Sequence, residues 1–140
     1  HHAVLLLERG LVLLVDHLAM GRGFTPSDHG HWHALGRLAE HPHVYLKASF
    51  MPETGASPEA FVQPLRHLYE RFGPERICWG SNFPIVLETC SYERAVAFAR
   101  TAFTFLATDE AEAVFYGTAD RLLSRQTDGR SSTSSERGER

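Results

Sequence analysis

The stretch Arg76-Ile77-Cys78-Trp79-Gly80-Ser81-Asn82-Phe83-Pro84 begins as a short apolar segment and passes directly into polar residues, and we expect a strand over residues 76–81. Two earlier segments, residues 11–17 and 44–49, have the same plan of an apolar run followed by polar residues. The run Leu11-Val12-Leu13-Leu14-Val15 shows no apolar–polar alternation, which is typical of a strand buried on both faces of a parallel sheet. The sequence therefore predicts strands of a parallel sheet.

Apolar residues at helical spacing fill the segments between and after these strands. They predict helices over residues 28–40, 57–72, 92–106 and 108–116, with a last turn or two over 118–123. We expect Gly117 to break the helix before it, and residues 3–9 to end a helix that precedes the first strand. The alternation of strand and helix predicts right-handed crossovers and an α/β fold.

The composition allows an apolar core and gives no sign of a polyanionic partner. The 140 residues are 43% hydrophobic, and 14 Lys and Arg against 17 Asp and Glu give a net charge of -3. This balance gives no electrostatic case for nucleic acid binding. No run approaches the roughly 18 apolar residues of a membrane helix, so we expect no membrane partner. Cys78 and Cys90 lack metal-type spacing, and a buried, reduced Cys78 fits a cytoplasmic location.

The composition changes near the end of the chain. Residues 126–140 contain no aliphatic or aromatic side chain. Such a segment cannot bury enough apolar surface to offset the conformational entropy lost on folding. We therefore expect one domain over residues 1–125, followed by a disordered tail over residues 126–140.

Polar residues stand directly behind each predicted strand. They are Asp16 and His17, Lys47 and Ser49, and Ser81 and Asn82. Because the carboxyl ends of parallel strands share one edge, where the sites of α/β folds gather, we expect these side chains to lie near one another. A complete eight-stranded barrel takes roughly 250 residues, so these strands supply only part of one.

Three segments resemble, in order, the sixth, seventh and eighth barrel strands of the amidohydrolase-related family (amidohydrolase 2). They are Leu14-Val15-Asp16-His17-Leu18, Val44-Tyr45-Leu46-Lys47-Ala48-Ser49, and the segment from Phe72 to Pro84. Residues 115–122 resemble the family's C-terminal helix. The resemblance covers nearly all of residues 1–125 and implies the C-terminal part of a TIM (β/α)8-type barrel, about strands 6–8 with their helices. The family's first strand, with its His-x-His pair, and its fifth strand, with a further histidine, are not in this sequence.

The resemblance implies a catalytic role for His17 and Asn82. The family's matching histidine acts as an acid or base, contacts substrate or, in some members, binds metal, and an imidazole suits proton transfer near neutral pH. Asn82 stands where many relatives have an aspartate that binds metal or activates water. A neutral amide cannot act as a base but can orient a carbonyl or a water, so Asn82 disfavours a tightly bound zinc without excluding a divalent metal. A structural histidine and a loop-capping asparagine are the alternatives.

We expect Lys47 and Ser49 to bind substrate at the same edge, with a solvated lysine as the alternative for Lys47. Ser81 has no evident base partner, so we do not expect it to be a nucleophile. His31 and His33 spell a His-x-His pair within a predicted helix, where residues two apart diverge and cannot easily share one metal. Trp32 between them is expected in the core.

The resemblance implies a hydrolase that acts on a lactone or amide of a small acidic molecule. We expect the 140-residue chain alone to have little activity, because much of the family's site lies outside it. Two alternatives stay open: a nonoxidative decarboxylase, which the family also contains, and a degenerate noncatalytic domain that packs on a partner. Open barrel edges expose unpaired backbone and apolar faces, which predicts self-association.

Overall fold

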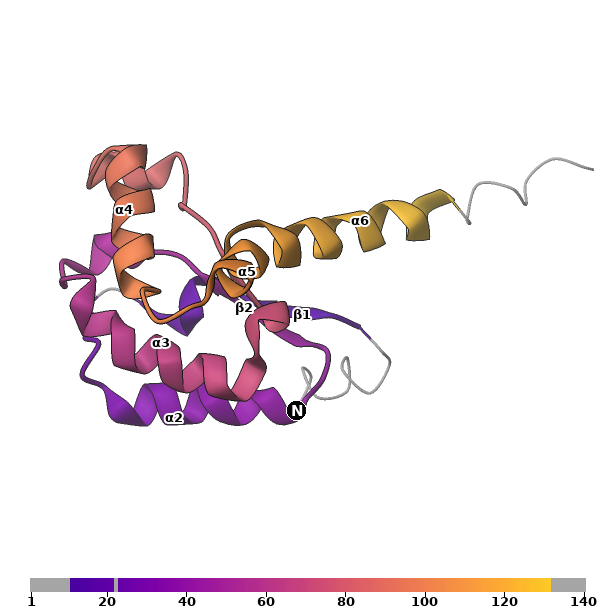
Figure 1. The fold of residues 1–140 in the computed structure, drawn as a ribbon, viewed down its shortest axis with the longest axis horizontal. Coiled ribbons are helices and arrows are strands. Elements are labelled where there is room, and N and C mark those ends of the chain that lie inside the picture. The colour runs from indigo at the N-terminus through magenta and orange to yellow at the C-terminus, as the bar shows by residue number, and fades with distance from the viewer. Residues whose placement is uncertain (1–10, 22, 132–140) are drawn as a thin grey trace, which may run out of the picture.

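Strands and helices alternate in the predicted order. A computed structural model describes residues 11–21 and 23–131, so the helix end expected over residues 3–9 lies outside the described residues. The elements that build the sheet and its helical cover are β1 (Leu13–Val15), α2 (His29–Arg37), β2 (Val44–Ala48), α3 (Glu59–Phe72), β3 (Ile77–Trp79) and α4 (Tyr92–Ala102). The strands pair in parallel in the order β1-β2-β3. The prediction of an α/β fold with a parallel sheet is confirmed (Figure 1).

The two faces of the sheet differ in burial. Every second residue of β2 is fully buried, namely Val44, Leu46 and Ala48. Tyr45 and Lys47 point to the opposite face and are only partly buried. In the parallel register Leu14 pairs with Tyr45, and Leu14 is 42% exposed. The prediction that β1 is buried on both faces is wrong, because the described helices leave Leu14 uncovered.

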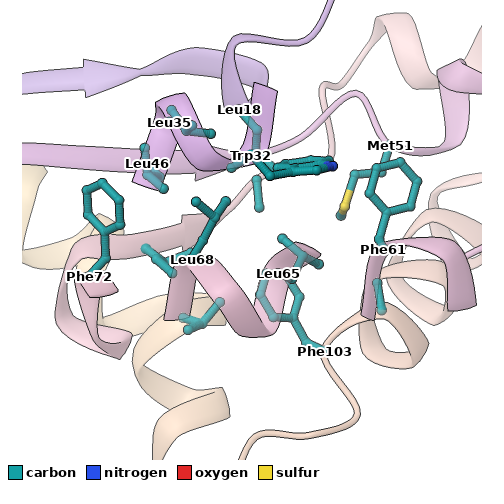
Figure 2. Packing of buried hydrophobic residues seen from close by; sticks show 14 of the residues in the cluster. Leu18, Trp32, Leu35, Leu46, Met51, Phe61, Leu65, Leu68, Phe72 and Phe103 are labelled. Carbon is teal, nitrogen blue, oxygen red and sulfur yellow. The ribbon is translucent and has the colours of Figure 1, made fainter. Parts of the chain in front are cut away.

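An apolar core lies between the sheet and the helices α2 and α3, which run side by side (Figure 1). α3 supplies one face of it through residues at helical spacing, namely Phe61, Leu65, Leu68 and Phe72. Trp32 of α2 meets Phe61 edge-on, with ring centroids 6.4 Å apart, and its indole N–H donates to the Pro26 carbonyl at 2.7 Å. Figure 2 shows Trp32 within this cluster, so its predicted core position is confirmed.

The C-terminal helices differ from the prediction. α5 (Thr108–Glu112) passes through a π-helical turn, η6 (Ala113–Gly117), directly into α6 (Thr118–Ser131), so Gly117 does not break the helix. α6 also extends six residues into the segment 126–140 for which disorder is predicted, and residues 132–140 lie outside the described part. Figure 1 shows α6 projecting from the body of the molecule. Within the described residues, no helix combines the length and apolar character needed to cross a membrane.

Thr118 ties the start of α6 to the segment before β3. It is fully buried, and its hydroxyl donates to the Pro74 carbonyl at 3.0 Å, in the short helix η4 (Pro74–Arg76). The same hydroxyl oxygen accepts from Arg121, which also pairs with Glu75. The C-terminal helix is thereby held against the segment that leads into β3, the strand that precedes Asn82.

Candidate active site

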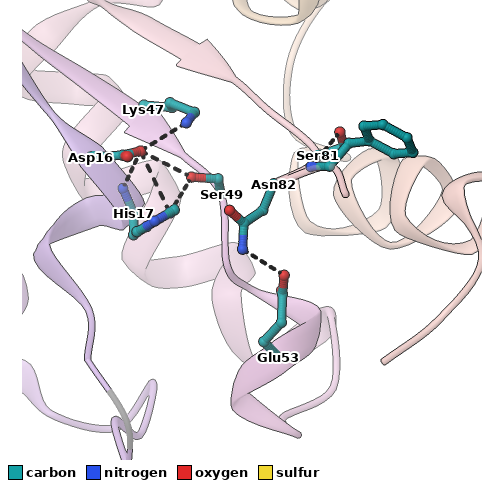
Figure 3. A network of polar contacts seen from close by, with 8 residues as sticks. Asp16, His17, Lys47, Ser49, Glu53, Ser81 and Asn82 are labelled. Carbon is teal, nitrogen blue, oxygen red and sulfur yellow. Dashed lines mark hydrogen bonds and ion pairs between the residues drawn. The ribbon is translucent and has the colours of Figure 1, made fainter. Parts of the chain in front are cut away.

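The loops behind β1, β2 and β3 meet at the carboxyl edge of the sheet (Figure 3). Each contains a non-glycine residue with left-handed backbone: φ is 53° at His17, 64° at Phe50 and 61° at Asn82. L-residues seldom adopt this conformation, and where it is held in place by the surrounding fold it is frequent at functional sites. The polar residues predicted from the sequence lie on or beside these three turns.

Asp16 is the centre of a polar cluster at this edge. Its Oδ1 accepts from Lys47 Nζ at 2.9 Å and from the His17 backbone N–H at 2.9 Å. Ser49 Oγ lies 3.4 Å from the same oxygen, and His17 Nδ1 lies 3.5 Å from it. The fold therefore brings three predicted site residues together around one carboxylate.

The surroundings of Asp16 favour its charged form. Partial burial by itself would raise the pKa of Asp16. The hydrogen bond and positive charge of Lys47, followed by the charge and backbone N–H of His17, outweigh burial and hold the pKa of Asp16 below its ordinary value. The group is therefore an ionised carboxylate at neutral pH, and it only accepts hydrogen bonds.

The His17 ring is held through one of its two nitrogens. Nδ1 lies 2.7 Å from Ser49 Oγ, on the side that faces Asp16. Because Asp16 only accepts, the Ser49 hydroxyl satisfies both neighbours by donating to Asp16 and accepting from a protonated Nδ1. This arrangement favours the tautomer whose Nε2 is free to accept a proton.

Ser49 itself is not placed as a nucleophile. It is 1% exposed and shares the Nδ1 side of His17 with Asp16. In a Ser-His-Asp hydrolase, the serine and the aspartate contact opposite nitrogens of the ring. Ser49 is thus a positioning residue for His17, and its burial does not support the predicted contact with substrate.

The Lys47 side chain reaches Asp16 by passing close to Gly80, which has no side chain to block it. A Cβ added to Gly80 would lie 2.7 Å from Lys47 Cε, so the absence of a side chain there makes room for the lysine stem. The ammonium has three donors, and its ion pair with Asp16 leaves others for a substrate oxygen. The predicted binding of substrate by Lys47 stays a prediction.

Asn82 follows β3 and is oriented by a residue from another loop. Its Nδ2 donates to Glu53 Oε1 at 2.9 Å. A carboxylate only accepts, so this bond decides which end of the amide faces Glu53 and leaves Oδ1 on the other end. Figure 3 shows that oxygen directed toward the side on which Ser49 and His17 lie. Capping of the loop falls to Ser81, whose Oγ accepts from the Phe83 N–H at 3.3 Å.

The described residues do not make a metal site by themselves. Across residues 11–21 and 23–131, no group of three or more His, Cys, Asp or Glu side chains is placed to hold an ion. Asn82 offers only a neutral oxygen, which is a weak ligand for zinc. On α2, His31 Nε2 lies 2.9 Å from the Leu18 carbonyl, whereas the His33 ring stacks against His67 with centroids 6.2 Å apart. The two histidines of the His-x-His pair therefore have different partners.

Asp16, which was expected at this edge, and Glu53 belong to the site, but neither was predicted to act in catalysis or to bind substrate. The sequence does indicate Asp16, because this residue stands directly between a predicted strand and His17. Glu53 lies in the short helix η3 (Pro52–Thr54), within a loop that carries no motif. Its contact with Asn82 joins residues 29 positions apart, so only the path of both loops reveals it.

Comparison with known proteins places the chain in a family. The profile of the family described as Amidohydrolase matches residues 6–125. The chain belongs to the amidohydrolase family, and the resemblance found in its strand segments is confirmed.

Two curated relatives are L-fucono-1,5-lactonases. The protein from Burkholderia ambifaria is 34% identical over 84 residues, which cover 54% of this chain and 27% of the relative. The protein from Burkholderia multivorans is 33% identical over 97 residues, which cover 63% of this chain and 33% of the relative. The chain therefore spans about a third of the length of these lactonases.

Solved structures share the fold. An amidohydrolase from Burkholderia multivorans with bound zinc matches at a TM-score of 0.67 and 26% identity, over 84% of this chain and 46% of its own. A protein from Pseudomonas putida described as a 2-pyrone-4,6-dicarboxylic acid hydrolase matches at a TM-score of 0.70 and 24% identity, over 86% and 47%. This second likeness shows the fold alone. The chain thus has the α/β architecture and parallel sheet of the amidohydrolase TIM barrels.

Proposed function

We propose that residues 1–125 are the C-terminal part of a TIM barrel, about strands 6–8 with their helices, in an enzyme that hydrolyses the lactone of a small molecule. The sheet order β1-β2-β3 and the match to just under half of a solved amidohydrolase support the barrel. The lactonase relatives support the reaction. The observation that carries the chemistry is the His17 ring, which Ser49 holds through Nδ1 beside Asp16.

In this proposal His17 is the general base. Its Nε2 takes a proton from water as the water oxygen bonds to the lactone carbonyl carbon. Asp16 stabilises the positive charge that forms on the ring. When the bond from the carbonyl carbon to the ring oxygen breaks, His17 returns the proton to that oxygen, and the product is a hydroxy acid. Asn82 Oδ1 orients the attacking water by accepting its second hydrogen.

The proposal is tested by hydrolysis of L-fucono-1,5-lactone by the complete protein, followed through acid release. We expect His17→Ala to lower kcat by about 10²- to 10⁴-fold, the usual contribution of a general base. His43, an exposed histidine in the turn before β2, provides the matched control, and His43→Ala should leave the rate unchanged. Full activity in His17→Ala, or no lactone turnover by the unaltered protein, would reject the proposal.

The same proposal sets expectations for residues 1–140 on their own. Because the chain spans about a third of the lactonases it resembles, we propose that it has little activity alone. The unpaired Cys78 and Cys90 accord with the cytoplasmic location that we propose.

A further inference from the structure

A cavity of about 320 Å³ opens beside the Asp16 cluster. The loops behind all three strands contribute to its wall, through Gly21 and Gly23, Phe50 and Glu53, and Ile85 and Glu88. It adjoins the candidate active site twice: the Phe50 ring centroid lies 5.5 Å from that of His17, and Glu53 accepts from Asn82. Its volume is at the lower end of the roughly 300–1,000 Å³ typical of ligand pockets, which suits a small molecule.

One polar atom of Glu53, a residue that lines this cavity, lacks a partner among the described residues. Glu53 Oε1 accepts from Asn82, but Glu53 Oε2 is buried and has no hydrogen-bond partner within residues 11–21 and 23–131. A buried carboxylate oxygen without a donor destabilises the fold unless a ligand or an ordered water supplies one. Oε2 is therefore a hydrogen-bond acceptor that a ligand or an ordered water can satisfy.

The charges around the cavity define which ligand can supply that donor. Among the described residues in its wall, the charged side chains are those of Glu53 and Glu88. Lys47, which was expected to bind substrate, is not among the residues that line this cavity. An ionised substrate carboxylate cannot donate to Glu53, whereas a hydroxyl group can. Phe50 and Ile85 add an apolar surface for the carbon skeleton of such a ligand.

We propose that Glu53 is a specificity-determining residue whose Oε2 accepts a hydrogen bond from a hydroxyl group of a polyhydroxylated lactone. This inference rests on the proposed lactone hydrolysis and names the substrate class of that site. It assigns Glu53 two tasks: Oε1 sets the orientation of Asn82, and Oε2 recognises the ligand.

The test compares the binding of two lactones by calorimetry, using complete protein with His17→Ala to prevent turnover. L-Fucono-1,5-lactone carries hydroxyl groups, and δ-valerolactone has the same ring size without them. Glu53→Ala should weaken binding of the hydroxylated lactone by about 10- to 100-fold, the effect of losing a charged hydrogen bond, and leave binding of δ-valerolactone unchanged.

Glu53→Gln keeps an acceptor for Asn82 and should show a smaller loss in binding of the hydroxylated lactone. Glu40→Gln, at an exposed carboxylate that does not line this cavity, is the matched control and should bind both lactones normally.

Three results would overturn the inference: no binding of L-fucono-1,5-lactone, an equal loss of both lactones in Glu53→Ala, or tighter binding of 2-pyrone-4,6-dicarboxylate than of the hydroxylated lactone. The equal loss would mean that Glu53 only supports the loop. Turnover by protein with His17 intact is measured separately. Discrimination by Glu53 without any turnover would support this inference and reject the proposed hydrolysis.

Discussion

Asp16 joins residues from two different loops through a single oxygen. Lys47 and Ser49 reach it from the end of β2 and the residue just beyond, and His17 adjoins it in the chain. The carboxylate sets the charge balance of the site, because its negative charge offsets the positive charge of Lys47. A substitution at Asp16 or Lys47 is therefore expected to change the electrostatic surroundings of His17, the proposed base.

Lys47→Met is expected to raise the pKa of Asp16, because partial burial then acts without the opposing hydrogen bond and charge. An NMR titration of the Asp16 carboxyl carbon measures this directly. In the unaltered protein the lowered pKa stabilises the fold above the unfolded-state pKa, and this contribution is lost as pH falls through the folded-state pKa. Lys47→Arg keeps the charge and should keep the low pKa. An unchanged titration in Lys47→Met would contradict the cluster described here.

The clustering of His17, Lys47 and Ser49 follows from the sequence, because parallel strands place their carboxyl ends at one edge. The central position of Asp16 and the use of Glu53 do not follow from it. They depend on the paths of loops that contain residues with left-handed backbone, such as Phe50 with φ of 64°. A bulky side chain such as phenylalanine does not indicate this conformation in a sequence.

Among the elements, α6 is fixed to η4, the short helix before β3, by the buried hydroxyl of Thr118. Thr118→Val keeps the side-chain shape but removes the hydrogen bonds to Pro74 and Arg121. The Pro74 carbonyl still accepts from the Ile77 N–H, so we expect a loss of about 1 kcal/mol in unfolding free energy. Urea denaturation measures it.

Thr101→Val is the matched control for this prediction. Thr101 is exposed on α4, and its hydroxyl donates to the Ala97 carbonyl within the same helix. The same chemical change there should alter stability by no more than about 0.5 kcal/mol. Equal effects of the two substitutions would mean that the buried contact to Pro74 does not hold α6 in place.

Periodicity predicts the strand and helix order, but it does not predict how the C-terminal helices join. Gly117 is expected to end a helix, yet the wider π-helical turn at Ala113–Gly117 keeps the chain helical into α6. The disorder expected from residue 126 rests on the lack of apolar side chains. Backbone hydrogen bonds in a helix need no apolar partner, and α6 continues to Ser131.

At the scale of the whole molecule, the β1 edge of the sheet is exposed within residues 11–21 and 23–131. Within the described residues β1 pairs with β2 alone. The apolar residues that begin this edge are exposed, at 52% for Leu11, 44% for Val12 and 42% for Leu14. Such an edge provides unpaired backbone groups next to apolar side chains, which is the usual template for pairing with another chain.

We therefore expect residues 1–140, produced alone, to self-associate in sedimentation velocity experiments. Leu14→Lys should reduce the association, because a charge on this face is costly to bury. Leu123→Lys, at a 65% exposed leucine on α6, is the control and should not. A well-behaved monomer at tens of micromolar, or an equal effect of both lysines, would show that the open edge does not drive assembly.

The close approach of Gly80 to Lys47 limits the order in which this site can evolve. A lineage that first replaces Lys47 with a shorter residue gains freedom at position 80 and can later accept a side chain there. A lineage that first enlarges position 80 pushes the lysine stem away from Asp16 while the site still depends on it. Substitutions at positions 47 and 80 should therefore be non-additive, and a side chain at position 80 should cost less stability once residue 47 is short.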